Sequence, residues 1–175
     1  MRRLHQLILI IAVLLFSGTC LASDEAMLDE NAPQPSFVQK SIDKAHNTLG
    51  YALSLVGVNY KFGGTSPETG LDCSGFVRHV FSQAADMILP HNAKAISLFG
   101  KKIAIAELKP GDLVFYNTMR HTYSHVGIYL GGNKFVHASV TGRGVEVVDM
   151  QENYWVKRFN GARRMVTSRL PFAAS

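Results

Sequence analysis

Hydrophobic positions recur at helical spacing in the first part of the chain beyond residue 35. In residues 37–56 they fall three to four positions apart, as on one face of a helix. Ser36 precedes this segment and is a suitable helix cap, and Gly57 follows it as a suitable stop. The pattern therefore predicts a long helix over the segment.

A second amphipathic helix is predicted over residues 73–85, with Asp72 as its cap. Its predicted buried face consists of Phe76, Val77, Val80, Phe81 and Ala84. Residues 59–70, which precede it, are rich in glycine and predict a loop. A shorter helical stretch is expected over residues 91–99.

After the turn at residues 109–112, the pattern changes to alternating or continuous runs of β-forming residues. The predicted strands are residues 113–116, 125–130, 134–138, 145–149 and 159–166. Gly131-Gly132-Asn133 between two of these runs is a hairpin signal. Helices followed by an antiparallel meander predict an α+β domain, with the helices packed on a sheet of about five strands.

Composition narrows the class of protein. The chain has 175 residues, which suits one ordinary domain, and its 47% hydrophobic and 18% charged residues are typical of a globular protein. The formal charge of +5 includes Arg2 and Arg3 near the N-terminus. The rest of the chain has no dense cluster of Lys and Arg, so nucleic-acid binding is not expected.

The first 22 residues resemble an export signal, with a basic start, an apolar core over residues 7–16 and small residues after it. The apolar run is short for a membrane span. Cleavage after Ala22 is the favoured processing. The alternative is lipidation of Cys20, which would anchor the chain to a membrane, although Thr19 is unusual before a lipidated cysteine. Either route predicts a periplasmic or cell-envelope location.

The remaining boundaries follow from composition. Residues 23–35 carry acidic residues and prolines but no Lys or Arg, and they predict a flexible linker. The folded domain is expected over residues 36–167, with a tail at residues 168–175.

Cys73 is the cysteine left after removal or lipidation of the leader, so it has no disulfide partner. It lies where the glycine-rich segment meets the second predicted helix. Backbone N–H groups and the helix dipole at that point are expected to stabilise a thiolate. The alternative is that Cys73 is an inert, buried small side chain.

His125 and His137 lie in two strands that the predicted hairpin joins, so both rings can share one side of adjacent strands. With Cys73, they would supply a nucleophile, a base and a group that orients the base. The other histidines are expected to be surface or structural residues: His5, His46, His79, His91 and His121. A metal site of Cys73, His125 and His137 is the other polar interpretation, but close ligand pairs typical of zinc sites are missing.

Several blocks of sequence occur in an order that resembles the NlpC/p-sixty family of bacterial cell-wall cysteine peptidases, which have a papain-like core. The blocks are residues 60–64, 70–77, 110–115, 125–131 and 135–138. The resemblance extends over about residues 49–166. It implies that Cys73 is the nucleophile, that His125 is the general base and acid, and that His137 orients His125.

The resemblance also implies roles around the nucleophile. Tyr60 would help to bind the substrate carbonyl or oxyanion, while Asp72 and Ser74 would line the substrate groove. Asp72 is also explained as a helix cap alone. One departure concerns His91, which occupies a position where members of the family often have arginine, so the resemblance does not imply a substrate-carboxylate contact there.

The implied function is a cysteine endopeptidase that hydrolyses amide bonds in peptidoglycan stem peptides or cross-links. The short, single-domain murein endopeptidases of Gram-negative bacteria are the most similar type. Peptidoglycan is the expected partner, a monomer is expected, and no cofactor or metal is implied. The alternatives are an amidase or acyltransferase on another substrate, and a non-catalytic wall-binding module.

Overall fold

The computed structural model describes residues 36–119, 121–141 and 143–165. The predicted export signal with Cys20, the linker and the C-terminal tail lie outside these residues. Among the helices described, none is long and apolar enough to cross a membrane.

Two long helices form where the sequence predicts them. Helix α2 spans Phe37–Ser54, and the Ser36 hydroxyl caps it by accepting the N–H of Gln39 at 3.2 Å. Helix α3 spans Cys73–Ala85 and begins at the candidate nucleophile. The remaining helices are short: α4 at Ala93–Ile96, the 3₁₀ turn η1 at Ile105–Glu107, and α5 at Asn153–Val156. Helix α4 is thus shorter than the predicted stretch over residues 91–99.

The main sheet has six strands in the order β3-β8-β4-β5-β6-β7, all paired antiparallel. Its strands are β3 (Lys101–Ile103), β4 (Leu113–Tyr116), β5 (His125–Gly131), β6 (Lys134–Ser139), β7 (Gly144–Asp149) and β8 (Phe159–Arg164). This confirms the predicted α+β class. Strands β4 to β7 form the predicted meander, but β8 does not extend it, because β8 crosses back to pair with β4. Strand β3 is the additional one, because its two exposed lysines give it no β-like hydrophobic pattern.

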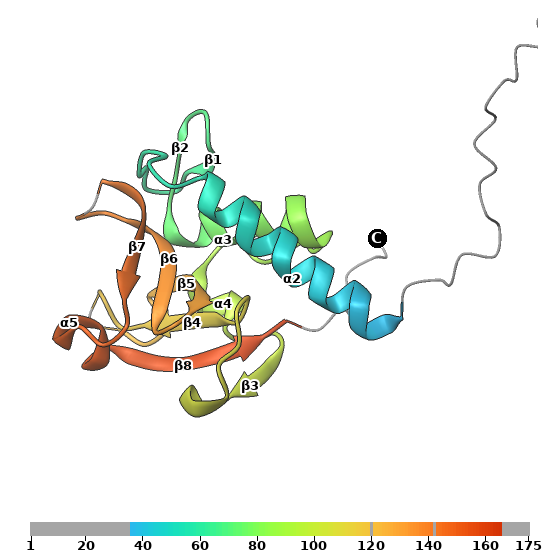
Figure 1. Ribbon diagram of the computed structural model, residues 1–175. Helices are drawn as coiled ribbons and strands as arrows, with labels where there is room; N and C mark the ends of the chain where they lie inside the picture. The colour runs from blue at the N-terminus through green and yellow to red at the C-terminus, as the bar shows by residue number, and fades with distance from the viewer. Residues whose placement is uncertain (1–35, 120, 142, 166–175) are drawn as a thin grey trace, which may run out of the picture. The chain divides into compact units, whose positions relative to one another are not determined.

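The glycine-rich segment is more ordered than the predicted loop. It contains a two-stranded sheet of β1 (Thr65–Ser66) and β2 (Gly70–Leu71). Tyr60 forms a β-bridge with Leu71, so the segment folds back beside the start of α3. Figure 1 shows this loop region above the N-terminal end of α3.

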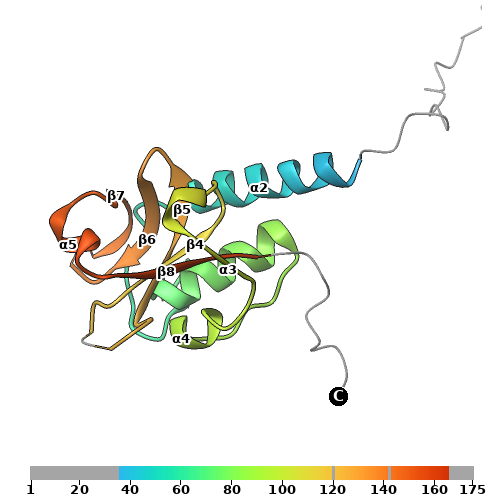
Figure 2. The ribbon, with the colours of Figure 1, turned by 90° about the horizontal axis from the view of Figure 1, so that it is seen from below.

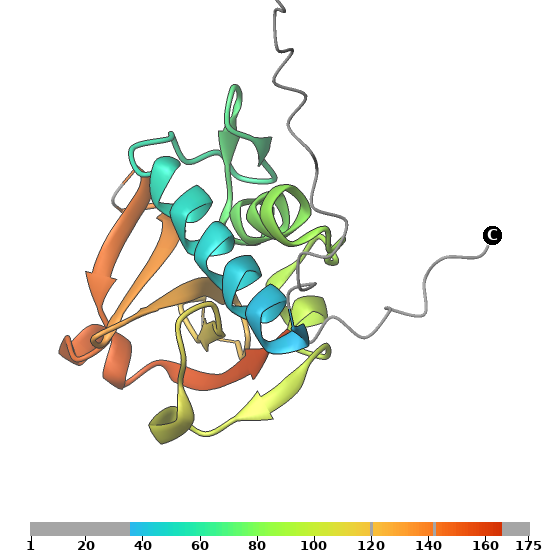
Figure 3. The ribbon, with the colours of Figure 1, turned by 45° about the vertical axis from the view of Figure 1, so that its right-hand side comes forward.

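Alternate residues of the strands form two cores on the two faces of the sheet. Phe115, Val126 and Val136 pack with α2, α3 and α4 on one face. Figures 2 and 3 show α2 and α3 side by side on this face. Tyr116 and Phe135 pack with Trp155 of α5 on the other face. The strand period of two thus separates the helical layer from a smaller aromatic core.

Candidate active site

The side chains that the sequence predicts for the site line one groove with a volume of about 970 Å³. They are Tyr60, Asp72, Cys73, Ser74, His125 and His137. They come from the glycine-rich segment, the start of α3, and strands β5 and β6. Tertiary packing therefore gathers residues that lie far apart in the sequence.

The Asp72 side chain holds the nucleophile segment in position. One carboxylate oxygen accepts the N–H of Gly75 at 2.7 Å and the hydroxyl of Ser74 at 2.9 Å, and the other accepts the N–H of Gly63 at 3.0 Å. Asp72 is therefore the helix cap that the sequence predicts. It also fastens the glycine-rich segment to the first turn of α3, where Cys73 lies.

Two glycines make this close packing possible. A Cβ atom on Gly75 would overlap the carbonyl oxygen of Gly64, and a Cβ on Gly64 would overlap the carbonyl of Gly70. The N–H of Asp72 donates to the Gly64 carbonyl at 3.1 Å. The loop backbone can therefore lie directly against the start of α3 only because these positions have no side chain.

The environment of the Cys73 sulfur contradicts the expected thiolate. Burial, followed by the negative charge of Asp72, raises the pKa of Cys73 to about 11. Backbone N–H groups of Val126, Ser74 and Cys73 face the sulfur and lower the pKa by a smaller amount. The expected N–H donors at the helix start are thus present and lower the pKa of the thiol. Desolvation raises the pKa by more, so the neutral thiol is favoured at neutral pH.

His125 and His137 form a hydrogen-bonded pair of buried rings. Nε2 of His125 lies 2.8 Å from Nδ1 of His137, and the planes of the rings are nearly perpendicular, at 86°. Burial lowers the pKa of each ring, and the charge of the His125 ring lowers that of His137 further. Both imidazoles are therefore neutral at neutral pH, and Nδ1 is the nitrogen of His125 that lies outside this hydrogen bond.

Trp155 packs against both imidazoles and has no role in the sequence analysis. Its ring is nearly parallel to that of His125, with a centroid separation of 5.9 Å, and lies edge-on to His137 at 5.1 Å. It is the single tryptophan of the chain. Its large apolar surface supports the burial of the pair, but nothing in its local sequence connects it with residues so far upstream.

Glu146 is a second neighbour that the sequence analysis missed. Glu146 lies directly opposite His137 in the pairing of β6 with β7. Its Oε1 atom lies 3.7 Å from Nε2 of His137. The alternating pattern of the strand gave no signal for this residue beyond a polar position, because its importance depends on cross-strand register.

Tyr60 and Ser74 flank the sulfur in different ways. Tyr60 is half-buried, and its pKa is raised by burial and then by the nearby charges of Cys73 and Asp72. Its hydroxyl is therefore a neutral donor beside the thiol at neutral pH. The Ser74 hydroxyl is buried and donates to Asp72 at 2.9 Å, so its observed contact supports the helix cap.

The rim of the groove includes histidines that were expected to be only surface or structural residues. His91 and His121 are exposed and line the groove. His91 occupies the position where members of the family often have arginine. A permanent cation lies three residues later, since Lys94 of α4 lines the same groove. A carboxylate-binding group is thus available close to the position where relatives often have arginine.

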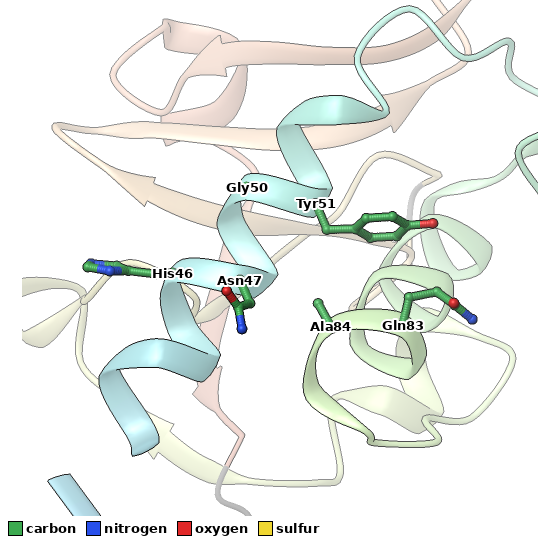
Figure 4. Close-up of a pocket in the computed structure, with 6 residues that line it drawn as sticks. All are labelled: His46, Asn47, Gly50, Tyr51, Gln83 and Ala84. Carbon is green, nitrogen blue, oxygen red and sulfur yellow. The ribbon is translucent and has the colours of Figure 1, made fainter. Parts of the chain in front are cut away.

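A second, shallower pocket of about 510 Å³ lies between α2 and α3 (Figure 4). His46, Asn47, Gly50, Tyr51, Gln83 and Ala84 line it. Figure 4 shows His46 pointing away from Gln83 and Ala84, and the Tyr51 hydroxyl is engaged by Nε2 of His79 at 2.9 Å. Within the described residues, no group of three or more His, Cys, Asp or Glu side chains could hold a metal ion.

Comparisons with known proteins match this architecture. The sequence model of the NlpC/P60 family matches residues 57–164. MepH of Escherichia coli strain K12, named a murein DD-endopeptidase, is 37% identical over 135 residues, which cover 75% of this chain and 49% of MepH. The chain therefore spans about half the length of that relative.

A second relative from the same organism is named murein DD-endopeptidase MepS/murein LD-carboxypeptidase. It is 35% identical over 147 residues, which cover 84% of this chain and 77% of the relative. A solved structure of a lipoprotein-like NLP/P60 protein from Staphylococcus aureus Mu50 superposes with a TM-score of 0.65 at 31% identity, covering 77% of this chain and 45% of that one. The extent of these matches shows that the chain belongs to the NlpC/P60 family.

Proposed function

We propose that this protein is a cysteine endopeptidase that hydrolyses amide bonds in peptidoglycan. The observation that carries the proposal is one groove lined by a thiol and by two imidazoles that are hydrogen-bonded to each other. Membership of the NlpC/P60 family supports the same conclusion, and so do relatives named murein endopeptidases.

In the proposed reaction, Nδ1 of His125 takes the proton of the Cys73 thiol as the sulfur attacks the scissile carbonyl carbon. The carbonyl oxygen becomes an oxyanion, which the backbone N–H of Cys73 and the hydroxyl of Tyr60 stabilise. His125 then gives its proton to the leaving amine, and an acyl-Cys73 thioester is formed. Water, deprotonated by His125, hydrolyses the thioester and restores the free thiol.

The pKa shifts support general-base transfer at the moment of attack rather than a pre-formed ion pair. The pKa of Cys73 is raised to about 11, and the pKa of His125 is lowered, so both groups are neutral in the resting site. His125 has its Nε2 engaged by His137 at 2.8 Å. This bond holds the ring angle and the tautomer in which Nδ1 is free to accept a proton.

We further propose that the scissile bond joins D-amino acids in the cross-links between stem peptides, at diaminopimelate. The names of MepH and MepS describe DD-endopeptidases. Lys94 and the histidines on the rim are suited to the carboxylates of such peptides. The proposed location is the cell envelope, with the leader either cleaved after Ala22 or lipidated at Cys20.

The test is incubation of the purified protein with isolated sacculi, followed by mass analysis of the released muropeptides. The parent protein should convert cross-linked dimers into monomers, and Cys73→Ala should release none. Equal release by Cys73→Ala would overturn the thiol mechanism. Binding of sacculi without release would indicate a non-catalytic wall-binding module, and turnover confined to acyl-chain amides or esters would indicate the amidase or acyltransferase alternative.

A further inference from the structure

Nε2 of His137 is a buried nitrogen with no hydrogen-bond partner among the described residues. The His137 side chain is only 1% exposed, so water does not solvate this atom freely. A buried N–H without a partner costs about 1–3 kcal/mol, which makes such an atom uncommon in a folded protein. The Glu146 carboxylate lies close to this nitrogen, with Oε1 at 3.7 Å.

The proposed reaction fixes which nitrogen of each imidazole carries the proton, and it places the His137 proton on Nε2, the nitrogen near the Glu146 carboxylate. For Nδ1 of His125 to accept the thiol proton, the ring must carry its own proton on Nε2. That Nε2–H then donates to Nδ1 of His137, 2.8 Å away, so the proton of the neutral His137 ring sits on Nε2. The Nε2–H of His137 is therefore available to the carboxylate of Glu146, its cross-strand partner on β7.

Glu146 is free to close the remaining gap. Its side chain is 37% exposed and lines the groove, whereas the His137 ring is buried between Phe135 and Trp155. Rotation about its own torsions can shorten the 3.7 Å separation to hydrogen-bond length without movement of the backbone. The gain is largest when His125 becomes positively charged, because the carboxylate then balances a charge inside a buried pair.

We propose that Glu146 is a positioning residue that acts through His137 on His125, so that His125, His137 and Glu146 form one relay in the groove that Cys73 also lines. This inference rests on the proposed function. Glu146 keeps the His137 proton on Nε2 and stabilises the imidazolium that His125 becomes during attack. No proton is transferred to Glu146, so the reaction stays balanced as the thiol proton moves to His125 and then to the leaving amine.

Other titratable groups in the groove can also affect the pKa values of His125 and His137. The titratable side chains that line the groove together with the two imidazoles are Tyr60, Asp72, Cys73, His91, Lys94, His121, Tyr123, Glu146, Glu152 and Tyr154. Asp72 favours the protonated form of His125, and Glu146 is the carboxylate 3.7 Å from the buried Nε2 of His137. Removal of the Glu146 charge should therefore lower the pKa of the pair even though Asp72 is retained.

The experiment compares Glu146→Gln with the parent protein in two assays. In the first, the rate of Cys73 alkylation by iodoacetamide is measured against pH in the absence of substrate. Glu146→Gln should slow alkylation at pH 7 by about three- to tenfold, because the thiolate paired with protonated His125 is less stable. This readout does not require that peptidoglycan is the substrate, so it separates failure of the relay from failure of the proposed function.

In the second assay, kcat and KM are measured on a purified cross-linked muropeptide across pH. We expect Glu146→Gln to lower kcat about tenfold with little change in KM, and to move the acidic limb of kcat/KM down by about half a unit to one unit. Glu146→Asp, which retains the charge, should recover part of both effects. The matched control is Asp149→Asn, the same loss of charge at the far end of β7, opposite Lys134.

The relay is overturned if Glu146→Gln leaves both the alkylation rate and the acidic limb at parental values. It is also overturned if Asp149→Asn produces the same shifts, because the effect would then belong to the general charge of β7. A rise in KM with unchanged kcat would instead make Glu146 a substrate contact and reject the positioning role. Thermal unfolding of each variant identifies any loss of activity that comes from loss of folded protein.

Discussion

Nε2 of His125 lies 2.8 Å from Nδ1 of His137 although 12 positions separate the residues in the sequence. The hairpin between β5 and β6 brings them together, and antiparallel pairing places both rings on one face. Both imidazoles are buried, so water does not compete for this hydrogen bond. The orientation of the proposed base therefore depends on the side chain at position 137.

Two replacements of His137 should show whether catalysis depends on a hydrogen-bond acceptor that orients the His125 ring. His137→Ala removes the acceptor for His125 Nε2–H, and we expect kcat to fall about 10²- to 10³-fold. His137→Gln supplies an amide oxygen that can accept the same proton, so it should retain at least about tenfold more activity than His137→Ala. Steady-state hydrolysis of a cross-linked muropeptide measures both, and equal activity of the two variants would contradict an acceptor role.

Gly75→Ala should damage the nucleophile segment. The new Cβ would overlap the Gly64 carbonyl oxygen, so the glycine-rich segment and the start of α3 must separate. We expect a loss of about 2 kcal/mol or more in the free energy of unfolding, together with loss of activity.

Gly50→Ala is the matched control, because Gly50 lies in α2 and a Cβ there meets no atom within 4 Å. This variant should gain up to about 1 kcal/mol from better helix propensity. Urea unfolding measures both changes. Equal stabilities for the two variants would show that the close contact at Gly75 is unimportant.

Asp112→Ala should destabilise the sheet far from the groove. Asp112 is buried, and both of its carboxylate oxygens accept from the Arg164 guanidinium, at 2.8 and 2.7 Å. The bidentate pair joins the start of β4 to the end of β8. Because Arg164 is partly exposed, we expect a loss of about 2–3 kcal/mol rather than the full cost of a buried charge. Asp43→Ala, on the exposed face of α2, should change stability by less than about 0.5 kcal/mol.

The stability of the fold should fall on both sides of neutral pH. Burial lowers the pKa of His125 and His137 below the unfolded value. Their contribution to the free energy of unfolding is therefore complete above about pH 6.5, and it is lost as the pH falls toward their folded pKa values. The pKa of Cys73 is raised from 9.0 to about 11, so its contribution is lost as the pH rises through this interval. Urea unfolding between pH 4 and 11 measures both limbs. Cys73→Ala should flatten the alkaline limb, and an unchanged limb would contradict the raised pKa.

Lys94→Gln should weaken substrate binding without altering the chemistry. Lys94 is exposed on α4 and lines the groove near His91, where it can attract a substrate carboxylate. We expect KM for a cross-linked muropeptide to rise about three- to tenfold, with kcat within about twofold, and the effect should shrink as salt is added. Lys134→Gln, at the exposed β5–β6 hairpin, is the control and should leave KM unchanged.

Local sequence was sufficient for most of the elements. The bounds of α3 and the cap at Asp72 follow from a polar residue before an amphipathic segment, and those signals act within one helical turn. The predicted strands match β4 to β8 within a few residues because continuous or alternating runs of β-forming residues are typical of buried strands. Strand β3 escaped prediction because its pairing with β8 outweighs the poor strand pattern of Lys101 and Lys102.

The sequence by itself determined that a thiol at a helix start and two strand histidines belong to an α+β domain of the NlpC/P60 type. Only the tertiary structure decided how those groups are charged and what surrounds them. The sequence predicts a thiolate at Cys73 because the N–H donors of a helix start are a local feature. The structure favours a neutral thiol, because desolvation of the sulfur depends on all the residues packed around it. Glu146 and Trp155 joined the histidine pair through strand register and packing across the sheet, and those contacts have no signature in the residues beside them.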